Sequence, residues 1–353
     1  MDTPTTQCTI VIPIYNRPDC LERILAYYEK YIGERYSIIV ADSSLDKNKK
    51  INKEIVSARQ KQRILYIDTY PTEINPFHKI ADAVNYVESK YCVICADDDF
   101  IIPNGIEKAI EFLERNTDFT TAHGAYISFF LKNSGKAQPQ FIWQPIYPYS
   151  SIVSDSAKER LIKHFADYCQ TMYAVHRTEF LQMIYRELLE SKVDPLLFGE
   201  LLPDMLTLIY GKMKRLKVLY AARQAFSTHG GNWPSMQDFK KVGKFDKEYE
   251  KFRNCLTVNL TKNSGLAQKE ASKVVDVGMD AYFKKFYAVP FYKKLRTAIL
   301  ACFPEKVSKK IRLVYQNFRS PESKDESVDT VEDPSSDYYK DFNILRSHIM
   351  FYG

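Results

Sequence analysis

The sequence predicts an α/β fold built on a mostly parallel central sheet, and two observations indicate it. Through residues 8–115, short runs of apolar and β-branched residues alternate with segments of helical periodicity. That alternation is typical of a parallel sheet with right-handed crossover connections. Three of the runs end directly in polar turns, at Asn16-Arg17, Asp42-Ser43 and Asp97–Asp99. Because ligands bind beyond the carboxyl ends of parallel strands, we expect these turns to form one site.

The individual elements follow from local patterns. Apolar residues recur at helical spacing after Asp19, for example at Leu21, Ile24, Leu25 and Tyr28. Strands are expected at 8–14, 36–41, 63–67 and from 91, with helices after Asp19, up to about Gln60, at 77–89 and from Pro103. Further on we expect a strand at 122–131, helices at 156–169 and 178–189 with a short strand at 171–175 between them, an apolar helix ending near Gly211, and a strand at 218–222.

Composition places the chain among ordinary globular proteins. Of its 353 residues, 45% are hydrophobic and 27% are charged, enough for one large domain with an appendage or for two domains. No apolar run reaches about 18 residues, and the run from Thr9 to Tyr15 is too short for a signal peptide. We therefore expect the protein to be made and kept in the cytosol.

Seven cysteines, an odd number scattered along the chain, favour reduced thiols over a disulfide framework. Cys92 and Cys95 form a CxxC motif, but they lie in an expected strand. Residues three apart on a strand face opposite sides, so this pair is poorly placed to share a zinc ion.

An apolar run ends without a spacer in three consecutive carboxylates, Asp97, Asp98 and Asp99. Adjacent carboxylates repel one another and are costly to bury, so they should lie at the open end of a strand beside a cation. Mg²⁺ and Mn²⁺ are hard ions that take such oxygen ligands together with phosphate oxygens. The alternative is a solvated acidic turn with no ligand.

These features resemble family 2 glycosyltransferases, which have the GT-A fold. Thr9–Pro18 resembles the opening strand of the family, Ser37–Ser44 is similar to its second strand, and the acidic triplet looks like its DxD element. The resemblance covers about the first 230 residues. It implies a GT-A fold, Rossmann-like with a mostly parallel sheet flanked by helices, and a metal-dependent, inverting sugar transfer. The donor implied is a nucleotide-sugar, with a UDP-sugar the first choice, for surface polysaccharide or glycolipid synthesis.

The resemblance also implies a donor and metal site. Its donor-binding residues would be Pro13, Tyr15, Asn16, Arg17, Asp42, Lys79, Asp97, Asp98 and Arg223. Its divalent ion, Mn²⁺ or Mg²⁺, would be held by Asp97, Asp99 and His229, with Asp98 and Asp99 as the other working pair. Three alternatives stay open: Asp42 caps its own turn, Lys79 faces solvent with Asp82, and His229 is a structural loop residue.

An inverting displacement needs a carboxylate base that takes the proton of the acceptor hydroxyl. The resemblance implies this base about a hundred residues after the triplet, where an acidic pair precedes a helix. Asp204 is our first choice and Glu200 the second. The family's adjacent Glu-Asp pair is split by three residues here. The alternative for Asp204 is a capping role at the helix N-terminus.

Charge separates the C-terminal part of the chain. Residues 240–319 hold 19 Lys and Arg against 7 Asp and Glu, whereas residues 320–353 hold 3 against 8. Two basic amphipathic stretches within 288–319 favour an anionic membrane surface, and a lipid-linked acceptor at the inner leaflet would explain them. The alternative is that their apolar stripes dock on the catalytic domain or on a second protomer of a homo-oligomer. No nucleic-acid-binding module is visible.

We therefore expect three parts: a GT-A catalytic domain at 1–235, a basic helical extension at 236–319, and an acidic linker with a C-terminal tail at 320–353. Residues 338–352 regain apolar and aromatic side chains, so this tail is expected to dock. Two other functions compete with a glycosyltransferase acting on a glycan or lipid-linked acceptor. One is a nucleotidyltransferase, although the first turn has no glycine-rich loop, and the other is a non-catalytic sugar-binding or scaffolding protein.

Overall fold

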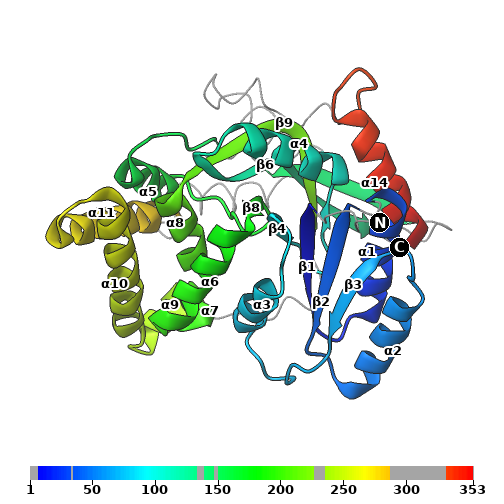
Figure 1. Ribbon diagram of the computed structural model, residues 1–353, viewed down its shortest axis with the longest axis horizontal. Coiled ribbons are helices and arrows are strands. Elements are labelled where there is room, and N and C mark those ends of the chain that lie inside the picture. The colour runs from blue at the N-terminus through cyan, green and yellow to red at the C-terminus, as the bar shows by residue number, and fades with distance from the viewer. Residues whose placement is uncertain are drawn as a thin grey trace, which may run out of the picture.

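The computed structural model describes residues 7–32, 35–132, 139–146, 150–225, 235–286 and 331–352. Within these ranges, nine strands form one sheet in the order β3-β2-β1-β4-β8-β6-β9-β5, with β7 paired to β6 (Figure 1). The strands are β1 Cys8–Ile14, β2 Tyr36–Asp42, β3 Arg63–Ile67, β4 Tyr91–Ile94, β5 Phe100–Ile101, β6 Phe119–Lys132, β7 Gln140–Ile146, β8 Val175–Arg177 and β9 Lys212–Gln224.

Helices connect and cover the strands. They are α1 Pro18–Tyr31, α2 Asp46–Ser57, α3 Pro76–Asn85, α4 Pro103–Arg115, α5 Ala157–Ala166, α6 Thr178–Ser191, α7 Pro195–Phe198, α8 Leu201–Tyr210, α9 Met236–Lys241, α10 Phe245–Ser264, α11 Gln268–Phe286 and α14 Tyr339–Tyr352. A proline begins α1, α3 and α4, where its missing N–H is not needed. The predicted α/β fold with a mostly parallel sheet is confirmed.

The first four strands run parallel, and β1 lies between β2 and β4. Alternate residues of β1 enter different cores, because successive side chains of a strand face opposite sides: Ile10 packs in one and Val11 in the other. The same alternation separates Cys92 from Cys95, as expected. Every cysteine among the described residues is a free thiol.

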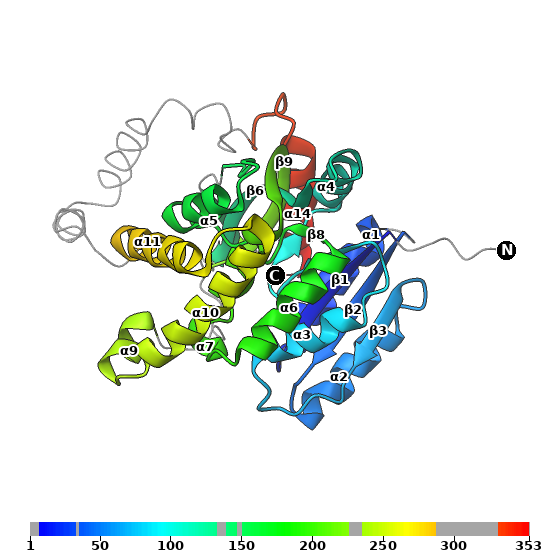
Figure 2. The ribbon, with the colours of Figure 1, turned by 60° about the vertical axis from the view of Figure 1, so that its left-hand side comes forward.

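Two hydrophobic cores cover the two faces of the sheet. The first contains residues of α1, α4 and α14. The second contains residues of α3, α5, α6, α8, α10 and α11, and α3 and α6 lie side by side against the sheet (Figure 2). Helices α9 to α11 therefore extend the second core beyond the sheet. No helix within the described ranges is long and apolar enough to cross a membrane.

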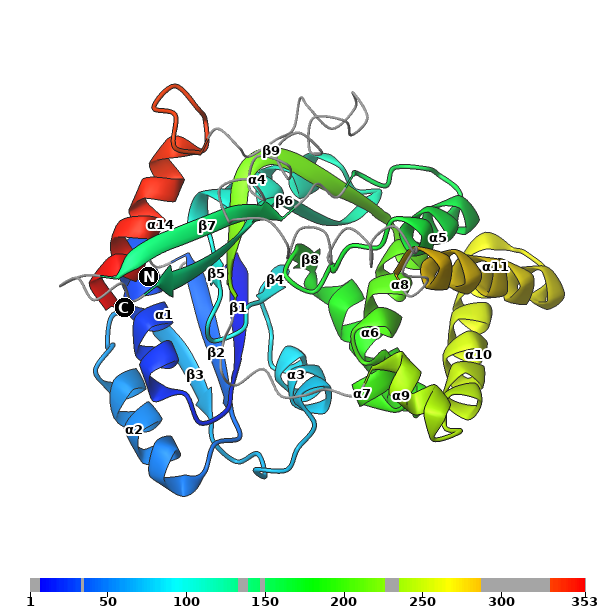
Figure 3. The same cartoon turned by 180° about the vertical axis from the view of Figure 1, so that it is seen from behind.

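Helix α14 docks on the first helix of the chain, which confirms the expected docking of the C-terminal tail. Phe342, Leu345 and Ile349 are fully buried in the first core. His348 Nε2 lies 2.9 Å from the carbonyl oxygen of Arg23 in α1. Both front and back views place α14 beside α1, at the end of the molecule opposite α10 and α11 (Figures 1 and 3).

Some local predictions were wrong. Residues 171–174 form a turn, and the strand expected at 171–175 begins only at Val175. Strand β7 was not predicted, because its sequence has Trp and Pro without a clear alternation. The basic stretches at 288–319 lie outside the described residues, as does His229.

Candidate active site

The three polar turns meet at one edge of the sheet, as the sequence predicts. The backbone N–H of Asn16 donates to Ser44 Oγ at 2.7 Å, which joins the turns after β1 and β2. Arg17 joins the first turn to the acidic triplet, with Nη1 2.8 Å from Asp97 Oδ1 and Nη2 2.8 Å from Asp98 Oδ2. Side chains from β1, β2 and β4 therefore form one polar cluster.

The first turn is held in an unusual conformation. Asn16 has φ of 55°, in the left-handed region that asparagine tolerates better than most residues. Its side-chain oxygen accepts from the Leu45 amide at 2.8 Å and from Asn48 Nδ2 at 3.0 Å. Pro13 is half-buried, and the side chain of Tyr15 is exposed. The turn is thus fixed by α2 and leaves Tyr15 open to a ligand.

Asp42 is fully buried at the end of β2. Its carboxylate accepts from the Ser44 amide at 2.7 Å, from Asn52 Nδ2 at 2.8 Å and from the Tyr66 hydroxyl at 2.7 Å. The bond to Ser44 is the turn contact that the sequence left as the alternative for this residue. Asp42 therefore shapes the turn that Asn16 contacts.

Lys79 on α3 points into the cluster, and the solvent-facing alternative for it is wrong. Its Nζ donates to the Ile14 carbonyl at 2.7 Å and to Ser43 Oγ at 2.8 Å. Burial lowers the pKa of Lys79 to about 8, against the opposing effect of nearby carboxylates. Asp82 points elsewhere and accepts from the Tyr70 hydroxyl.

The acidic triplet is largely buried, so the solvated-turn alternative is wrong as well. Asp97 and Asp99 are 5% and 3% exposed. Burial raises the pKa of Asp97 to about 7 and that of Asp99 to about 6. Asp99 also accepts hydrogen bonds from the Tyr173 hydroxyl and from the backbone N–H of Gln224, both at 2.7 Å. Buried carboxylates at a sheet edge are a feature of functional sites.

A second acidic group lies on α8. Asp204 is buried in the first turn of the helix, and Glu200 is exposed at its N-cap position. Asp204 Oδ1 accepts from the Thr171 amide at 3.0 Å and the Thr171 hydroxyl at 2.5 Å. Its carboxyl therefore binds the α5–β8 loop, and the capping alternative for Asp204 is wrong. The Tyr168 hydroxyl lies 2.6 Å from Asp204 Oδ2 and 2.7 Å from Glu200 Oε1.

Arg223 connects the two acidic groups. Its Nε lies 3.5 Å from Asp99 Oδ2, and its Nη1 donates to Gln170 Oε1 at 2.9 Å. Gln170 Nε2 donates in turn to Glu200 Oε2 at 3.0 Å. The triplet and the pair on α8 therefore belong to one continuous polar network.

The family model described as "Glycosyl transferase family 2" matches residues 9–188. The chain belongs to glycosyl transferase family 2. It is therefore a glycosyltransferase, of enzyme class EC 2.4. The match includes all three turns of the sheet edge, whereas Glu200 and Asp204 lie beyond it. No curated protein matches the sequence.

Solved structures are similar to this glycosyltransferase in fold. Residues 1–349 of S. aureus TarS in complex with UDP-GlcNAc share 14% identity and a TM-score of 0.53, over 82% of this chain and 77% of that fragment. The same protein with UDP gives 14% identity and 0.50, over 84% and 78%. The mannosyltransferase PcManGT from Pyrobaculum calidifontis, with GDP-Man and Mn²⁺, gives 12% and 0.46, over 99% and 86%. The fold of the glycosyltransferase is GT-A-like.

Whether the triplet suits a divalent ion depends on its oxygens. Asp99 uses both of its oxygens for Tyr173, Gln224 and Arg223. Asp97 and Asp98 each give one oxygen to Arg17. No group of three His, Cys, Asp or Glu side chains within the described ranges could hold a metal. An ion such as Mg²⁺ needs fewer protein ligands than that, because it binds one or two carboxylates and completes its shell with phosphate oxygens and water.

Sequence reasoning missed the loop between α5 and β8. This loop supplies the side chains that organise the α8 carboxyls and one contact of the triplet: Tyr168, Gln170, Thr171 and Tyr173. Arg23 was also missed, although its Nη2 donates to the Asp98 carbonyl and to Gln224 Oε1. The only signal for the loop was a polar and aromatic stretch directly after a helix.

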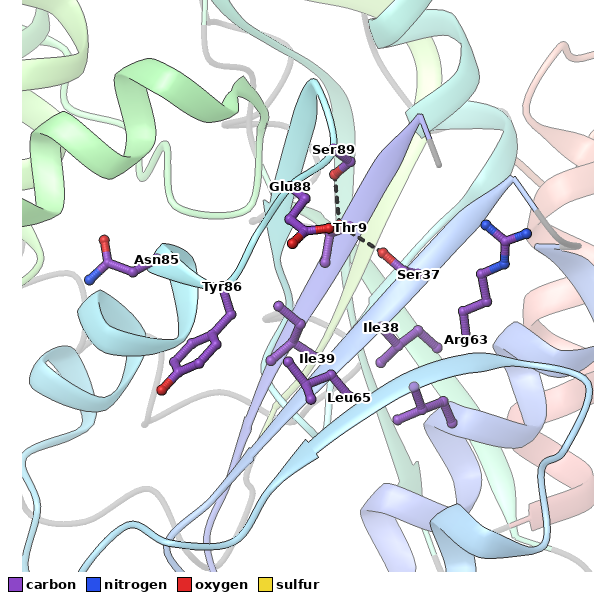
Figure 4. A pocket seen from close by; sticks show the side chains of 11 residues that line it. Thr9, Ser37, Ile38, Ile39, Arg63, Leu65, Asn85, Tyr86, Glu88 and Ser89 are labelled. Atoms are coloured by element: carbon purple, nitrogen blue, oxygen red, sulfur yellow. Dashed lines mark hydrogen bonds between the residues drawn. The ribbon is translucent and has the colours of Figure 1, made fainter. Parts of the chain in front are cut away.

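A separate groove of about 770 Å³ lies near the amino ends of the parallel strands, away from the triplet. Its lining comes from the starts of β1, β2 and β3 and from the end of α3, including Thr9, Ser37, Leu65 and Tyr86 (Figure 4). Thr9 Oγ1 lies 2.8 Å from Ser37 Oγ and 2.6 Å from Ser89 Oγ. The triplet follows the carboxyl end of β4, so this groove is not part of the site.

Proposed function

We propose that this glycosyltransferase moves a sugar from a nucleotide-sugar, with a UDP-sugar as first choice, to a glycan or lipid-linked acceptor, with inversion at the sugar carbon. The observation that carries the proposal is the network from Asp99 through Arg223 and Gln170 to Glu200. It joins a buried cluster suited to a diphosphate to an exposed carboxylate suited to an acceptor. Surface polysaccharide or glycolipid synthesis is the process we propose.

The donor half would hold the nucleotide and neutralise its diphosphate. We assign this role to the side chains at the sheet edge: Pro13, Tyr15, Asn16, Arg17, Asp42, Lys79, Asp97, Asp98 and Arg223. Three of these are cations, which attract phosphate oxygens, and Asp42 acts through the turn that it holds. A Mg²⁺ or Mn²⁺ ion would stabilise the charge that develops on the departing diphosphate. We propose Asp97 and Asp98 as its ligands, in place of the Asp97 and Asp99 expected from the sequence, because both oxygens of Asp99 already accept hydrogen bonds.

The acceptor half would supply the base. We propose Glu200 for this role, which reverses the order of preference drawn from the sequence. A base must touch the acceptor hydroxyl, and the Asp204 carboxyl is buried and already bound to Thr171 and Tyr168. Glu200 is exposed and lies one helical turn before Asp204.

A thermal-unfolding panel tests the proposal. UDP-, GDP-, CMP- and dTDP-sugars are each added with Mn²⁺ or with EDTA. A ligand at a hundred times its Kd stabilises the native state by about 2.7 kcal/mol, so one nucleotide should raise the midpoint in Mn²⁺. Asp97→Asn should lose that shift. The UDP ligands of TarS make UDP-sugars the first to try.

Product analysis separates the competing functions. Release of a nucleoside diphosphate with sugar on an acceptor supports the proposal. Release of pyrophosphate would indicate a nucleotidyltransferase, and a donor shift without turnover would indicate a non-catalytic sugar-binding protein. No shift with any donor would overturn the assignment of the donor half.

We also propose that residues 288–319 bring the enzyme to the anionic inner face of the plasma membrane. The support is the basic amphipathic pattern of the sequence, at about 1 kcal/mol for each Lys or Arg near a bilayer. Wild type should co-sediment with vesicles containing anionic lipid, and a chain lacking 288–319 should not. Equal sedimentation of the two would leave docking on a second protomer or on the catalytic domain.

A further inference from the structure

One tyrosine hydroxyl lies between the two carboxyl groups of α8. The Tyr168 oxygen is 2.7 Å from Glu200 Oε1 and 2.6 Å from Asp204 Oδ2. Both separations are typical of O–H···O hydrogen bonds and are too short for two oxygens with no proton between them. Each contact therefore needs its own proton.

The hydroxyl can supply only one of these two protons. A phenol has one O–H donor, and an ionised carboxylate has only acceptor oxygens. If Glu200 and Asp204 were both ionised, one of the two contacts would place lone pairs against lone pairs. One carboxyl group must therefore be protonated and donate to the tyrosine oxygen.

Burial decides which carboxyl holds that proton. Asp204 is 1% exposed, whereas Glu200 is exposed to solvent. Burial, followed by the Glu200 charge, raises the pKa of the Asp204 carboxyl well above its usual range. The neutral form also suits the remaining contacts, because Oδ1 accepts both hydrogen bonds of Thr171 and leaves Oδ2 to carry the proton.

The groups around Asp204 belong to several elements. Tyr168 and Cys169 come from the α5–β8 loop, and Tyr185 from α6. The Tyr282 ring of α11 packs against the ring of Tyr168, with centroids 5.5 Å apart. Arg223 of β9 faces Glu200, with Gln170 between them.

We propose that Asp204 is a neutral acid that donates to Tyr168, which donates in turn to an ionised Glu200. Asp204 and Tyr168 are then positioning residues, and Glu200 alone touches the acceptor. The inference rests on the proposed function, in which Glu200 is the base. In the transfer step, the acceptor O–H bond breaks and its proton passes to Glu200. The acceptor oxygen bonds to the sugar carbon as the bond from that carbon to the phosphate oxygen breaks, and the nucleoside diphosphate leaves with the electron pair of that carbon–oxygen bond.

The proposal makes Asp204 replaceable by an amide. In Asp204→Asn, Oδ1 can still accept from Thr171, and Nδ2 can donate to Tyr168 as the protonated carboxyl does. We expect kcat to stay within about threefold of wild type. Tyr168→Phe removes one donor from a charged group, so kcat should fall roughly ten- to a hundredfold and the acidic limb of the pH profile should move to higher pH.

A readout without activity tests the protonation directly. Infrared difference spectra of wild type against Asp204→Asn at pH 7 should contain the carbonyl stretch of one carboxylic acid. In Tyr168→Phe that band should shift, because the Asp204 carboxyl no longer donates a hydrogen bond to the Tyr168 oxygen. Stability gives a second readout, because a raised folded pKa means that the wild type loses stability as pH rises towards that pKa. The Asp204→Asn variant should not show this loss of stability with rising pH.

Each outcome decides between the two models. An active Asp204→Asn with the acid band supports the relay. An Asp204→Asn that folds but is inactive, or a wild type without the band, overturns it and returns the base to Asp204. If Asp204→Asn fails to fold, the band shift in Tyr168→Phe decides alone. A wild type that has the band but turns over no donor refutes the proposed function and leaves the relay in place.

Discussion

Replacement of Glu200 by Gln is expected to lower kcat by about 10²- to 10⁴-fold, the range over which a positioned general base acts. The amide has nearly the shape of the carboxylate but cannot take the proton of an acceptor hydroxyl. Glu200 is exposed and outside the cores, so folding should be preserved. Steady-state kinetics with the donor found in the thermal panel measure the effect, and the donor-induced shift should be unchanged.

The matched control is Glu190→Gln, an exposed glutamate near the end of α6. It makes the same chemical change away from the network and should keep wild-type kcat. Should Glu200→Gln retain kcat within about threefold, Glu200 would not be the base. A large loss in Asp204→Asn at the same time would assign the role to Asp204.

Arg17→Ala should have the largest effect on stability. Arg17 is the cation between Asp97 and Asp98, and the three side chains are 15%, 6% and 14% exposed. Removal of one partner from such a buried pair costs about 3–5 kcal/mol, because the remaining charges are left without compensation. We expect a loss of this size in EDTA, measured by chemical unfolding. Mn²⁺ should restore part of it and should stabilise the variant more than the wild type.

The pH dependence of Arg17→Ala has a definite sign. Burial raises the pKa of Asp97 to about 7 in the folded protein, so the folded state binds more protons than the unfolded state below that pH. Stability therefore falls as pH rises towards 7, and it should fall more steeply without Arg17. Arg35→Ala is the control, since its ion pair with Glu107 is 64% and 39% exposed and contributes at most about 1 kcal/mol. Equal Mn²⁺ shifts in wild type and Arg17→Ala would place the ion elsewhere.

The donor half of the site was predictable because it depends on the order of strands. Parallel strands with runs of β-branched residues can be recognised in the sequence, and their carboxyl ends lie at the same edge of the sheet. The meeting of Arg17 with Asp97 and Asp98 follows from that topology alone. The direction of Lys79 did not follow, because a helix with polar residues on several sides has no unique buried face in the sequence. Only the contact with Ile14 and Ser43 settles it.

The acceptor half was harder to predict, for two reasons. Glu200 and Asp204 lie one turn apart on α8, so periodicity gives both the same face, and exposure alone separates them. Their partners come from the α5–β8 loop, and loop conformation has no period that a sequence pattern could reveal. The turn at 171–174 was mistaken for a strand for that reason, although Thr171 and Tyr173 are the residues that reach the carboxyls.

Helix α14 has a consequence for how the protein is made. The first core combines Tyr27 and Phe100 with Phe342 and Ile349, and His348 contacts a residue 325 positions earlier. A ribosome-bound chain therefore exposes the α14 side of this core until residues 339–352 have been synthesised. Apolar surface that stays uncovered during synthesis is prone to aggregation and attracts chaperones. Strands β1 to β4 are synthesised well before α14, yet the sheet reaches its final packing only after α14 has been translated.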